Sequence, residues 1–383
     1  MTIIVEDDKE LEDLCTHLKS CEKVGVDLEG DGMYHFKEKV CLLQISDGVS
    51  DWIVDPLKAE KIEKLSPFFF DPKILKIFHG ADYDIKSLYR DYGIVVNNLF
   101  DTEIAARFAG LRLSGLDHLM FDFFGVKTEK KYQKKNWSIR PLPLDMLDYA
   151  AMDSKYLIEI YKILKEKLEK LQRLDWVYEE SSNISESRFV KKTETPYFTS
   201  FKGAGKLDKR SLAVLENLLK FRYSIAKKKD KPLYKIIPNK TIIKVAEKKA
   251  EKENELKLIM SPGHYKRFGL RISKIVQNAM EIPNSRLPSY PKKKKPKYFN
   301  YPASQRSQCL RKWRADKSKS LSLEPGIILN NNLLCEISEK NPKTFEDLLE
   351  ISLKRWQVRE FGDEILELIK GCSSENPENL SLY

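Results

Sequence analysis

The chain has 383 residues, 42% hydrophobic side chains and a formal net charge of +11. This length allows two or three domains, each with its own core, and the hydrophobic content excludes a globally disordered chain. We find no apolar run of membrane-spanning length and no basic-then-apolar leader over residues 1–6, so we expect a soluble, cytoplasmic protein without a membrane partner.

The positive charge is concentrated in the middle of the sequence. Residues 201–320 contain 33 basic and 9 acidic side chains, a net charge of +24, whereas residues 1–200 carry −7 and residues 321–383 carry −6. A charge that served only solubility would be spread more evenly. The middle segment therefore indicates a polyanionic partner, with nucleic acid as the first candidate.

The six cysteines are scattered along the chain, at positions 15, 21, 41, 309, 335 and 372. None of them shows the short paired spacing of zinc sites. We expect them to be reduced and mostly buried in the core.

The first part of the chain predicts a mixed sheet. Strands are expected at 2–5, 24–30, 40–45 and 51–54, with a helix at 8–20, and turn residues between the later strands favour an antiparallel meander. After Pro56 we expect a helix at 59–68, a strand at 74–78 and a helix at 82–92. Alternation of this kind predicts parallel strands with helical crossovers, and hence an α/β domain.

Two carboxylates lie on the strand predicted at 24–30, namely Asp27 and Glu29. Because strand side chains alternate faces, both point the same way while Leu28 points back. Two anions on one face favour the binding of a cation. Asp-x-Glu alone also fits a strand that continues into a solvated turn. A third acid, Asp84, falls in the first turn of the helix at 82–92, beside the sheet edge that carries Asp27.

Further helices are expected at 101–109, 115–124 and 144–171. In the last of these, Tyr149 and Asp153 are four residues apart, so they share one face of the helix. A phenol hydroxyl held one turn from a carboxylate suits the activation of a water molecule.

A strongly basic loop, residues 130–142, comes just before that last helix. Such a run is often a plain solvated loop. Its position next to the acidic block favours contact with phosphates instead, and the candidate substrate-binding residues in it are Lys134, Lys135, Trp137 and Arg140.

The rest of the chain divides into modules. After a first domain at 1–172, a polar stretch at 173–205 is expected to be a connecting arm, and two similar helical modules follow at 206–285 and 305–372. In each module an aromatic residue and an Arg (Phe221-Arg222, Trp313-Arg314) precede an Ile-Ile turn and a new helix with Asn near its start, where Asn caps well. The modules therefore form an internal repeat.

The segment between the modules, 286–304, contains the lysine run 292–295, and residues 373–383 form a C-terminal tail. The lysine run fits a flexible basic spacer, a nuclear-import signal or a contact for RNA. The sequence leaves these three readings open.

The three acidic blocks resemble those of the DEDD superfamily of 3′-5′ exonucleases, in the subclass with Tyr in the third block. A more specific resemblance, to ribonuclease D, covers nearly the whole chain. It rests on three motifs: His79-Gly80-Ala81-x-x-Asp84, Trp137-x-x-Arg140-Pro141-Leu142 and Tyr149-Ala150-Ala151-x-Asp153. The helical repeats resemble the helicase-and-ribonuclease-D C-terminal (HRDC) module. Two copies favour ribonuclease D over exosome-type relatives, which usually carry one.

This resemblance implies a ribonuclease H-like mixed-sheet exonuclease domain followed by two all-α HRDC domains. It implies that two divalent ions, Mg²⁺ or Mn²⁺, are held by four acids, and that a tyrosine orients the attacking water. The residues that match are Asp27, Glu29, Asp84 and Asp153 for the metals and Tyr149 for the water. Asp84 is preferred to Asp82 because the family motif places its Asp directly before an apolar residue, here Ile85.

The activity implied is hydrolysis of RNA from its 3′ end to nucleoside 5′-monophosphates, with tRNA precursors as the first candidate substrates and a monomer as the acting form. Two alternatives stay open. One is a catalytically silent RNA-binding relative, and the other is a DNA-directed 3′-5′ exonuclease.

Overall fold

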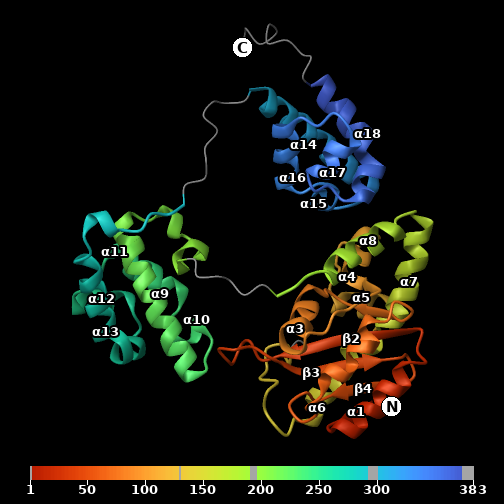
Figure 1. Ribbon diagram of the computed structural model, residues 1–383, viewed down its shortest axis with the longest axis horizontal. Helices are drawn as coiled ribbons and strands as arrows, with labels where there is room; N and C mark the ends of the chain where they lie inside the picture. The colour runs from red at the N-terminus through yellow and green to blue at the C-terminus, as the bar shows by residue number, and fades with distance from the viewer. Residues whose placement is uncertain (1, 129–130, 190–195, 292–300, 373–383) are drawn as a thin grey trace.

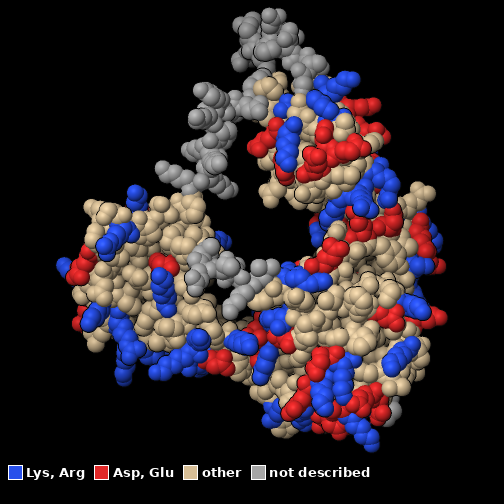
Figure 2. All heavy atoms as spheres, in the orientation of Figure 1, with Lys and Arg blue, Asp and Glu red and all other residues tan. Residues whose placement is uncertain are grey.

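The computed structural model describes residues 2–128, 131–189, 196–291 and 301–372. Figure 1 shows three lobes around a central opening: the sheet-containing lobe at residues 2–185 and two helical lobes, and Figure 2 shows the same arrangement as solid atoms. Among the described residues, none of the helices is long and apolar enough to cross a membrane. The lysine run 292–295 and the tail 373–383 lie outside the described residues.

A six-stranded mixed sheet forms the centre of the first lobe, in the order β1-β4-β3-β2-β5-β6. Its strands are β1 (Thr2–Val5), β2 (Lys23–Gly30), β3 (Val40–Ser46), β4 (Asp51–Val54), β5 (Leu75–Phe78) and β6 (Leu99–Asp101). β2, β3 and β4 pair antiparallel, whereas β1 with β4, β2 with β5 and β5 with β6 pair in parallel. The predicted mixed sheet is confirmed, with the short β6 as an additional strand.

Helices cover both faces of this sheet. One face packs on α1 (Asp8–Leu18), a 3₁₀ turn (Ile62–Leu65), α2 (Ser66–Phe70) and α3 (Asp82–Tyr92). Around the other face lie α4 (Thr102–Phe108), α5 (Leu116–Phe124), α6 (Leu144–Lys155), α7 (Leu157–Lys170) and α8 (Leu174–Ser185). Valines 24 and 26 point to the first face, so the alternate positions of β2, including Asp27, point to the second.

Two predicted helices are interrupted in the structure. The helix expected at 59–68 is a 3₁₀ turn followed by α2, because Pro67 fits only the first turn of a helix. The helix expected at 144–171 is two helices that meet at Tyr156. No Gly or Pro marks this junction, so the local pattern lacked the usual signal of a helix end.

The predicted connecting arm at 173–205 is wrong in its first part, where α8 packs onto the first lobe. Trp176 and Val177 of α8 are buried in the same core as α4 and α7. The Trp176 ring also stacks on Trp356 of the third lobe, with ring centroids 4.7 Å apart. α8 therefore joins two lobes through a shared apolar core.

The two helical lobes repeat one architecture. The second lobe contains α9 (Lys209–Lys229), α10 (Leu233–Ile236), α11 (Asn239–Lys248), α12 (Glu253–Ile259) and α13 (Pro262–Met280), and the third contains α14 (Tyr301–Leu321), α15 (Pro325–Ile328), α16 (Asn331–Lys340), α17 (Phe345–Glu350) and α18 (Arg355–Gly371). Short 3₁₀ turns lie at Tyr197–Ser200, Ala204–Lys206 and Asn284–Arg286.

Matching hydrogen bonds confirm the repeat. Arg222 donates to the Ile237 carbonyl (3.0 Å) and to Asn239 Oδ1 (2.6 Å). Arg314 donates in the same way to the Leu329 carbonyl (2.6 Å) and to Asn331 Oδ1 (3.1 Å). In each lobe the arginine thus joins its first helix to the start of the third.

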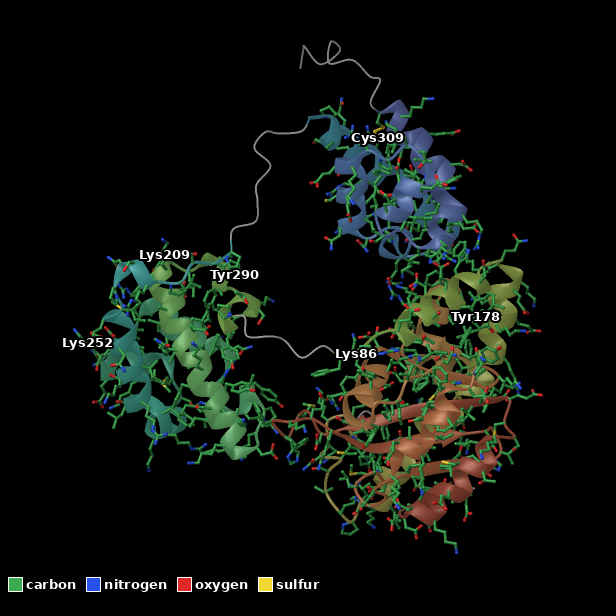
Figure 3. All side chains as sticks on the ribbon, in the orientation of Figure 1. Lys86, Tyr178, Lys209, Lys252, Tyr290 and Cys309 are labelled. Carbon is green, nitrogen blue, oxygen red and sulfur yellow. A yellow bond between two sulfur atoms is a disulfide. The ribbon has the colours of Figure 1, made fainter. Side chains whose placement is uncertain are left out.

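The expectation of six reduced, mostly buried cysteines is wrong for the third lobe. Cys309 on α14 forms a disulfide with Cys372, the residue that follows α18 (Figure 3). The two are 63 residues apart in sequence and come together only because α14 packs against α18. Of the four free cysteines only Cys41 is buried.

Candidate active site

Asp27 and Glu29 lie on β2, on the face of the sheet that α6 covers. Leu28 between them is buried in the core on the opposite face, as the strand alternation predicted. The pairing of β2 with β3 shifts register between Glu29 and Gly30. β2 therefore ends just beyond its second carboxylate, where the chain turns away into the loop 31–39.

α6 brings the third acidic block to this strand. One carboxylate oxygen from each of Asp27, Glu29 and Asp153 lies within 4.8 Å of the other two. The approach is close because β2 has no side chain at Gly25. A Cβ there would lie 2.5 Å from the Ser154 carbonyl oxygen and 3.0 Å from Leu157 Cβ.

This contact leads to a prediction for Gly25→Ala. The added methyl would push α6 away from β2, and overpacking of this kind costs about 1–3 kcal/mol. We expect a lower thermal midpoint without metal, together with slower hydrolysis of RNA. Gly263→Ala is the control, because nothing lies within 4 Å of that site. Equal thermal midpoints for the wild type and Gly25→Ala would show that α6 can move without loss of stability.

Asp84 comes from the first turn of α3 and is 6% exposed. Its charge contributes to the raised pKa of Glu29, but it is not one of the three carboxylates whose oxygens lie within 4.8 Å of one another. Asp82 is exposed and forms an ion pair with Lys86 (2.6 Å). The placement therefore supports the choice of Asp84 rather than Asp82.

Asp101 holds the turn that precedes α3, a role that the sequence analysis missed. Its carboxylate accepts the backbone N–H groups of Gly80 (3.0 Å) and Ala81 (2.8 Å). It also caps α4 by accepting the N–H of Glu103 (2.8 Å). The sequence predicted only that a helix begins at Asp101, because the turn at Gly80 is about twenty residues away.

The carboxylates of the cluster repel one another in a poorly solvated site. Burial, and then the charges of Asp27, Asp153 and Asp84, raise the pKa of Glu29 to about 10. Burial raises the pKa of Asp27, and burial together with the charge of Asp27 raises the pKa values of Asp84 and Asp153. Without a cation the cluster therefore favours protonated acids at neutral pH.

This donor set fits hard divalent cations. All the clustered donors are carboxylate oxygens, the ligands that Mg²⁺ and Mn²⁺ prefer. A bound cation would allow all the acids to ionise, since it replaces their mutual repulsion with attraction. Asp27, Glu29, Asp84 and Asp153 are the residues that would hold it.

Tyr149 faces the cluster from one turn before Asp153. Burial, followed by the charges of Asp153, Glu29 and Asp27, raises the pKa of Tyr149 above its usual range. The phenol is therefore neutral at physiological pH. Its ring is held beside the rings of Tyr132 (5.4 Å between centroids) and Trp137 (6.2 Å).

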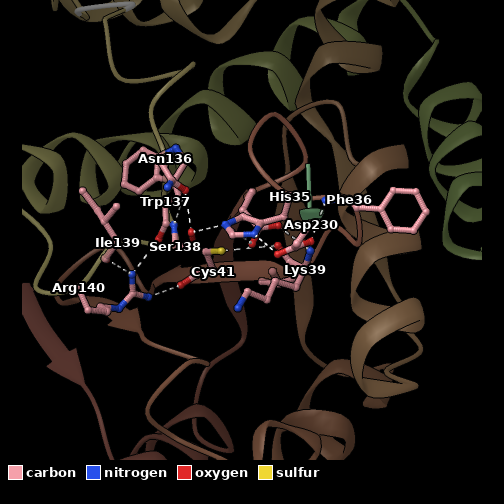
Figure 4. Close-up of polar contacts among 12 residues, drawn as sticks. His35, Phe36, Lys39, Cys41, Asn136, Trp137, Ser138, Ile139, Arg140 and Asp230 are labelled. Carbon is pink, nitrogen blue, oxygen red and sulfur yellow. Dashed lines mark hydrogen bonds and ion pairs between the residues drawn. The ribbon is translucent and has the colours of Figure 1, made fainter. Parts of the chain in front are cut away.

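The basic loop before α6 is anchored by two residues that we predicted to contact RNA. Trp137 is 1% exposed and packs in a core with Leu42. Arg140 donates to both carboxylate oxygens of Asp55 (2.6 Å each) and to the Cys41 carbonyl (2.9 Å; Figure 4). Both side chains thus fasten the loop to the sheet, and contact of Trp137 and Arg140 with substrate stays a prediction.

Lys134 and Lys135 are exposed in this loop, as expected of RNA contacts. The structure adds a hollow of about 290 Å³ beside Tyr149, lined by Lys127, Thr128, Lys131, Tyr132, Asp145, Asp148, Tyr149 and Met152. Of the two lysines of this hollow, Lys131 belongs to the basic loop and Lys127 precedes it. Their place beside the tyrosine depends on how the loop folds back, which the sequence pattern did not reveal.

The loop 31–39, which follows the carboxylates of β2, joins the second lobe to the basic loop. His35 contacts Asp230 Oδ2 through Nδ1 (2.6 Å) and Ser138 Oγ through Nε2 (2.9 Å; Figure 4). The Tyr34 hydroxyl donates to the Lys134 carbonyl (2.8 Å). The second lobe is therefore fastened next to the carboxylate cluster.

Known protein families match three parts of this chain. Residues 2–169 match a family model described as a 3′-5′ exonuclease, and residues 211–276 and 304–369 each match the HRDC domain. The crystal structure of the catalytic core of RRP6 from Trypanosoma brucei is 31% identical, with a TM-score of 0.65, over 75% of this chain and 81% of that chain.

Two curated proteins show how far the similarity extends. RRP6-like 2 of Arabidopsis thaliana is 34% identical over 276 residues, which cover 68% of this chain but 31% of that protein. Ribonuclease D of Bartonella henselae is 27% identical over 378 residues, or 97% of this chain and 91% of that protein. The chain thus spans about a third of the RRP6-like relative and nearly all of the ribonuclease D relative.

Proposed function

Since the chain belongs to the ribonuclease D family of 3′-5′ exonucleases with HRDC domains, we propose that it is a metal-dependent exoribonuclease that shortens RNA from the 3′ end. One observation carries the proposal. Three carboxylates from β2 and α6 converge within 4.8 Å, and Tyr149 lies one helical turn away.

The chain's own groups have distinct roles in this reaction. Asp27, Glu29, Asp84 and Asp153 would hold the divalent ions, and these ions would stabilise negative charge on the attacking and leaving oxygens. The neutral Tyr149 hydroxyl orients the attacking water by a hydrogen bond. No side chain has to act as the nucleophile. Attack by water on the last phosphodiester, with the 3′ oxygen as leaving group, releases a nucleoside 5′-monophosphate.

The second lobe supports a folded RNA as the substrate. A hollow of about 400 Å³ on it is lined by Lys229, Lys231, Tyr234, Lys235, Ile236, His264, Arg267 and Phe268. Figure 2 shows Lys and Arg side chains gathered along the lower edge of this lobe. We call the hollow with these eight lining residues the basic groove. It would hold the body of a structured RNA, such as a tRNA precursor, while the 3′ end of that RNA enters the carboxylate site of the same monomer. The reaction would take place in the cytoplasm.

The basic groove leads to a prediction for a triple variant, Lys229→Gln, Lys231→Gln and Arg267→Gln. Lys235 is left unchanged because its ammonium lies over the Tyr34 ring (4.0 Å) and helps to fasten the lobe. Each lost phosphate contact reduces the slope of log K against log salt by about 0.7–0.9. We therefore expect the slope for a tRNA precursor to decrease by about 2 to 3 in a filter-binding titration.

The matched control removes the same charge elsewhere, with Lys58→Gln, Lys61→Gln and Lys64→Gln. Each of these lysines is paired with an acid of the first lobe, namely Glu6, Asp8 and Glu12. We expect this variant to keep the wild-type slope. A groove variant with an unchanged slope would show that the RNA body binds elsewhere.

Digestion of an end-labelled tRNA precursor tests the function itself. We expect shortening from the 3′ end that requires Mg²⁺ or Mn²⁺ and is stopped by EDTA, with nucleoside 5′-monophosphates identified by chromatography. Single-stranded DNA is digested in parallel. Faster digestion of the DNA would make the protein a DNA exonuclease, and no digestion of either would leave an RNA-binding protein without catalysis.

A further inference from the structure

Gln44 lies in the middle of the sheet, directly beside the carboxylate cluster. It is on β3, where the register pairs it with Asp27 of β2 on one side and with Ile53 of β4 on the other. Directly opposed residues of antiparallel strands point to the same face of a sheet. The Gln44 side chain therefore shares with Asp27 the face that α6 covers.

Packing around Gln44 agrees with this placement. Leu42, two residues earlier on β3, and Ile53 form one buried cluster with Met146 and Ala150 of α6. Gln44 is 0% exposed, so its amide is enclosed between the sheet and α6. A glutamine at this position is unexpected, because its neighbours on the strands and the helix are mostly apolar.

The amide of Gln44 has no partner in this enclosure. Among the described residues neither Nε2 nor Oε1 makes a hydrogen bond, and the same is true of the buried hydroxyl of Ser154, next to Asp153. A buried amide without a hydrogen bond destabilises a fold, and an apolar side chain of the same size would pack there more favourably. Residues that break such a rule concentrate at functional sites.

We propose that Gln44 is a positioning residue for the metal centre. Its Nε2 donates to the Asp27 carboxylate when Asp27 holds a divalent ion, and this hydrogen bond fixes which oxygen faces the metal. Carboxylate ligands are commonly oriented by such a neighbour, and its loss lowers metal affinity. The inference rests on the proposed metal-dependent function and adds a residue to it.

Gln44→Met tests this role in the chain of 383 residues, because it removes both polar atoms and keeps the length of the side chain. We expect the Mn²⁺ affinity measured by calorimetric titration to fall by about 10- to 100-fold. The thermal midpoint in EDTA should equal or exceed that of the wild type, since an unpartnered buried amide has been removed. Gln44→Leu is measured beside it in case one variant fails to fold.

The control is Ile45→Leu, at the next position of β3, whose side chain is in the core on the opposite face. It should leave the Mn²⁺ affinity unchanged. A Gln44→Met protein with wild-type Mn²⁺ affinity would overturn the inference, and a lower midpoint in EDTA would then assign Gln44 a structural role.

Asp27→Asn separates this inference from the proposed function. If the wild type itself binds no Mn²⁺, the metal-dependent function fails. If the wild type binds Mn²⁺, Asp27→Asn does not, and Gln44→Met binds as the wild type does, only the role of Gln44 is wrong.

Discussion

Asp27→Asn is expected to lower the rate of RNA hydrolysis by at least about a thousandfold, because charge stabilisation by the metals is worth several kcal/mol of the barrier. Asp27 is the residue whose charge acts on Glu29, Asp84 and Asp153 alike. An amide in its place keeps the shape of the side chain but loses the negative charge that attracts a cation. The measurement is single-turnover digestion of an end-labelled RNA in Mg²⁺.

The same variant makes a second, structural test possible. Without metal, Asp27→Asn removes one of several repelling carboxylates, so its thermal midpoint in EDTA should be equal to or higher than that of the wild type. A saturating divalent ion should stabilise the wild type, by about 2.7 kcal/mol at a hundred times Kd, and should not stabilise the variant.

Asp82→Asn is the matched control, because Asp82 is an exposed acid two residues from Asp84 and pairs with Lys86. It should retain both the turnover and the stabilisation by metal. If Asp27→Asn hydrolysed RNA as fast as this control does, the assignment of the carboxylate cluster as the active site would be wrong.

Tyr149→Phe is expected to lower turnover by about two to four orders of magnitude, the range of a positioned acid-base group, with little change in RNA affinity. The reason is the position of the hydroxyl beside Asp153 and its neutral state. The ring should stay in place, since it packs beside Tyr132 and Trp137. Rates and affinities are measured separately, in single-turnover and filter-binding experiments.

Tyr178→Phe serves as the control for the loss of a phenol hydroxyl. Tyr178 lies on α8, and its hydroxyl is 3.3 Å from that of Tyr161, away from the carboxylates. Its turnover should stay close to that of the wild type. Wild-type turnover in Tyr149→Phe would mean that the hydroxyl has a structural role only.

The division of charge along the chain also suggests truncation after residue 200 as a test, but the structure argues against it. The third lobe shares a core with α8: Glu179 accepts the N–H groups of Arg355 (2.7 Å) and Trp356 (3.0 Å), and Trp176 stacks on Trp356. Removal of this lobe would expose that apolar surface. Point substitutions in the basic groove avoid the problem.

The sequence alone determined the features that depend on local periodicity. Strand alternation placed Asp27 and Glu29 on one face, and helical spacing placed Tyr149 one turn from Asp153, because both patterns are set by neighbours in the chain. The meander of β2, β3 and β4 could be predicted because turn residues separate consecutive short apolar strands in the sequence. The repeat was visible because equivalent residues recur at equivalent spacings.

Only the tertiary structure decided the roles that depend on contacts between distant segments. Arg140 meets Asp55 across 85 residues, so a basic residue that looked like an RNA contact is a partly exposed side chain that anchors its loop to the sheet. In the sequence Gln44 is only a polar residue on a strand. The strand register in the structure places it beside Asp27. Whether a charged or polar side chain faces solvent, a partner or a metal ligand depends on which segments pack together, and local sequence carries little of that information.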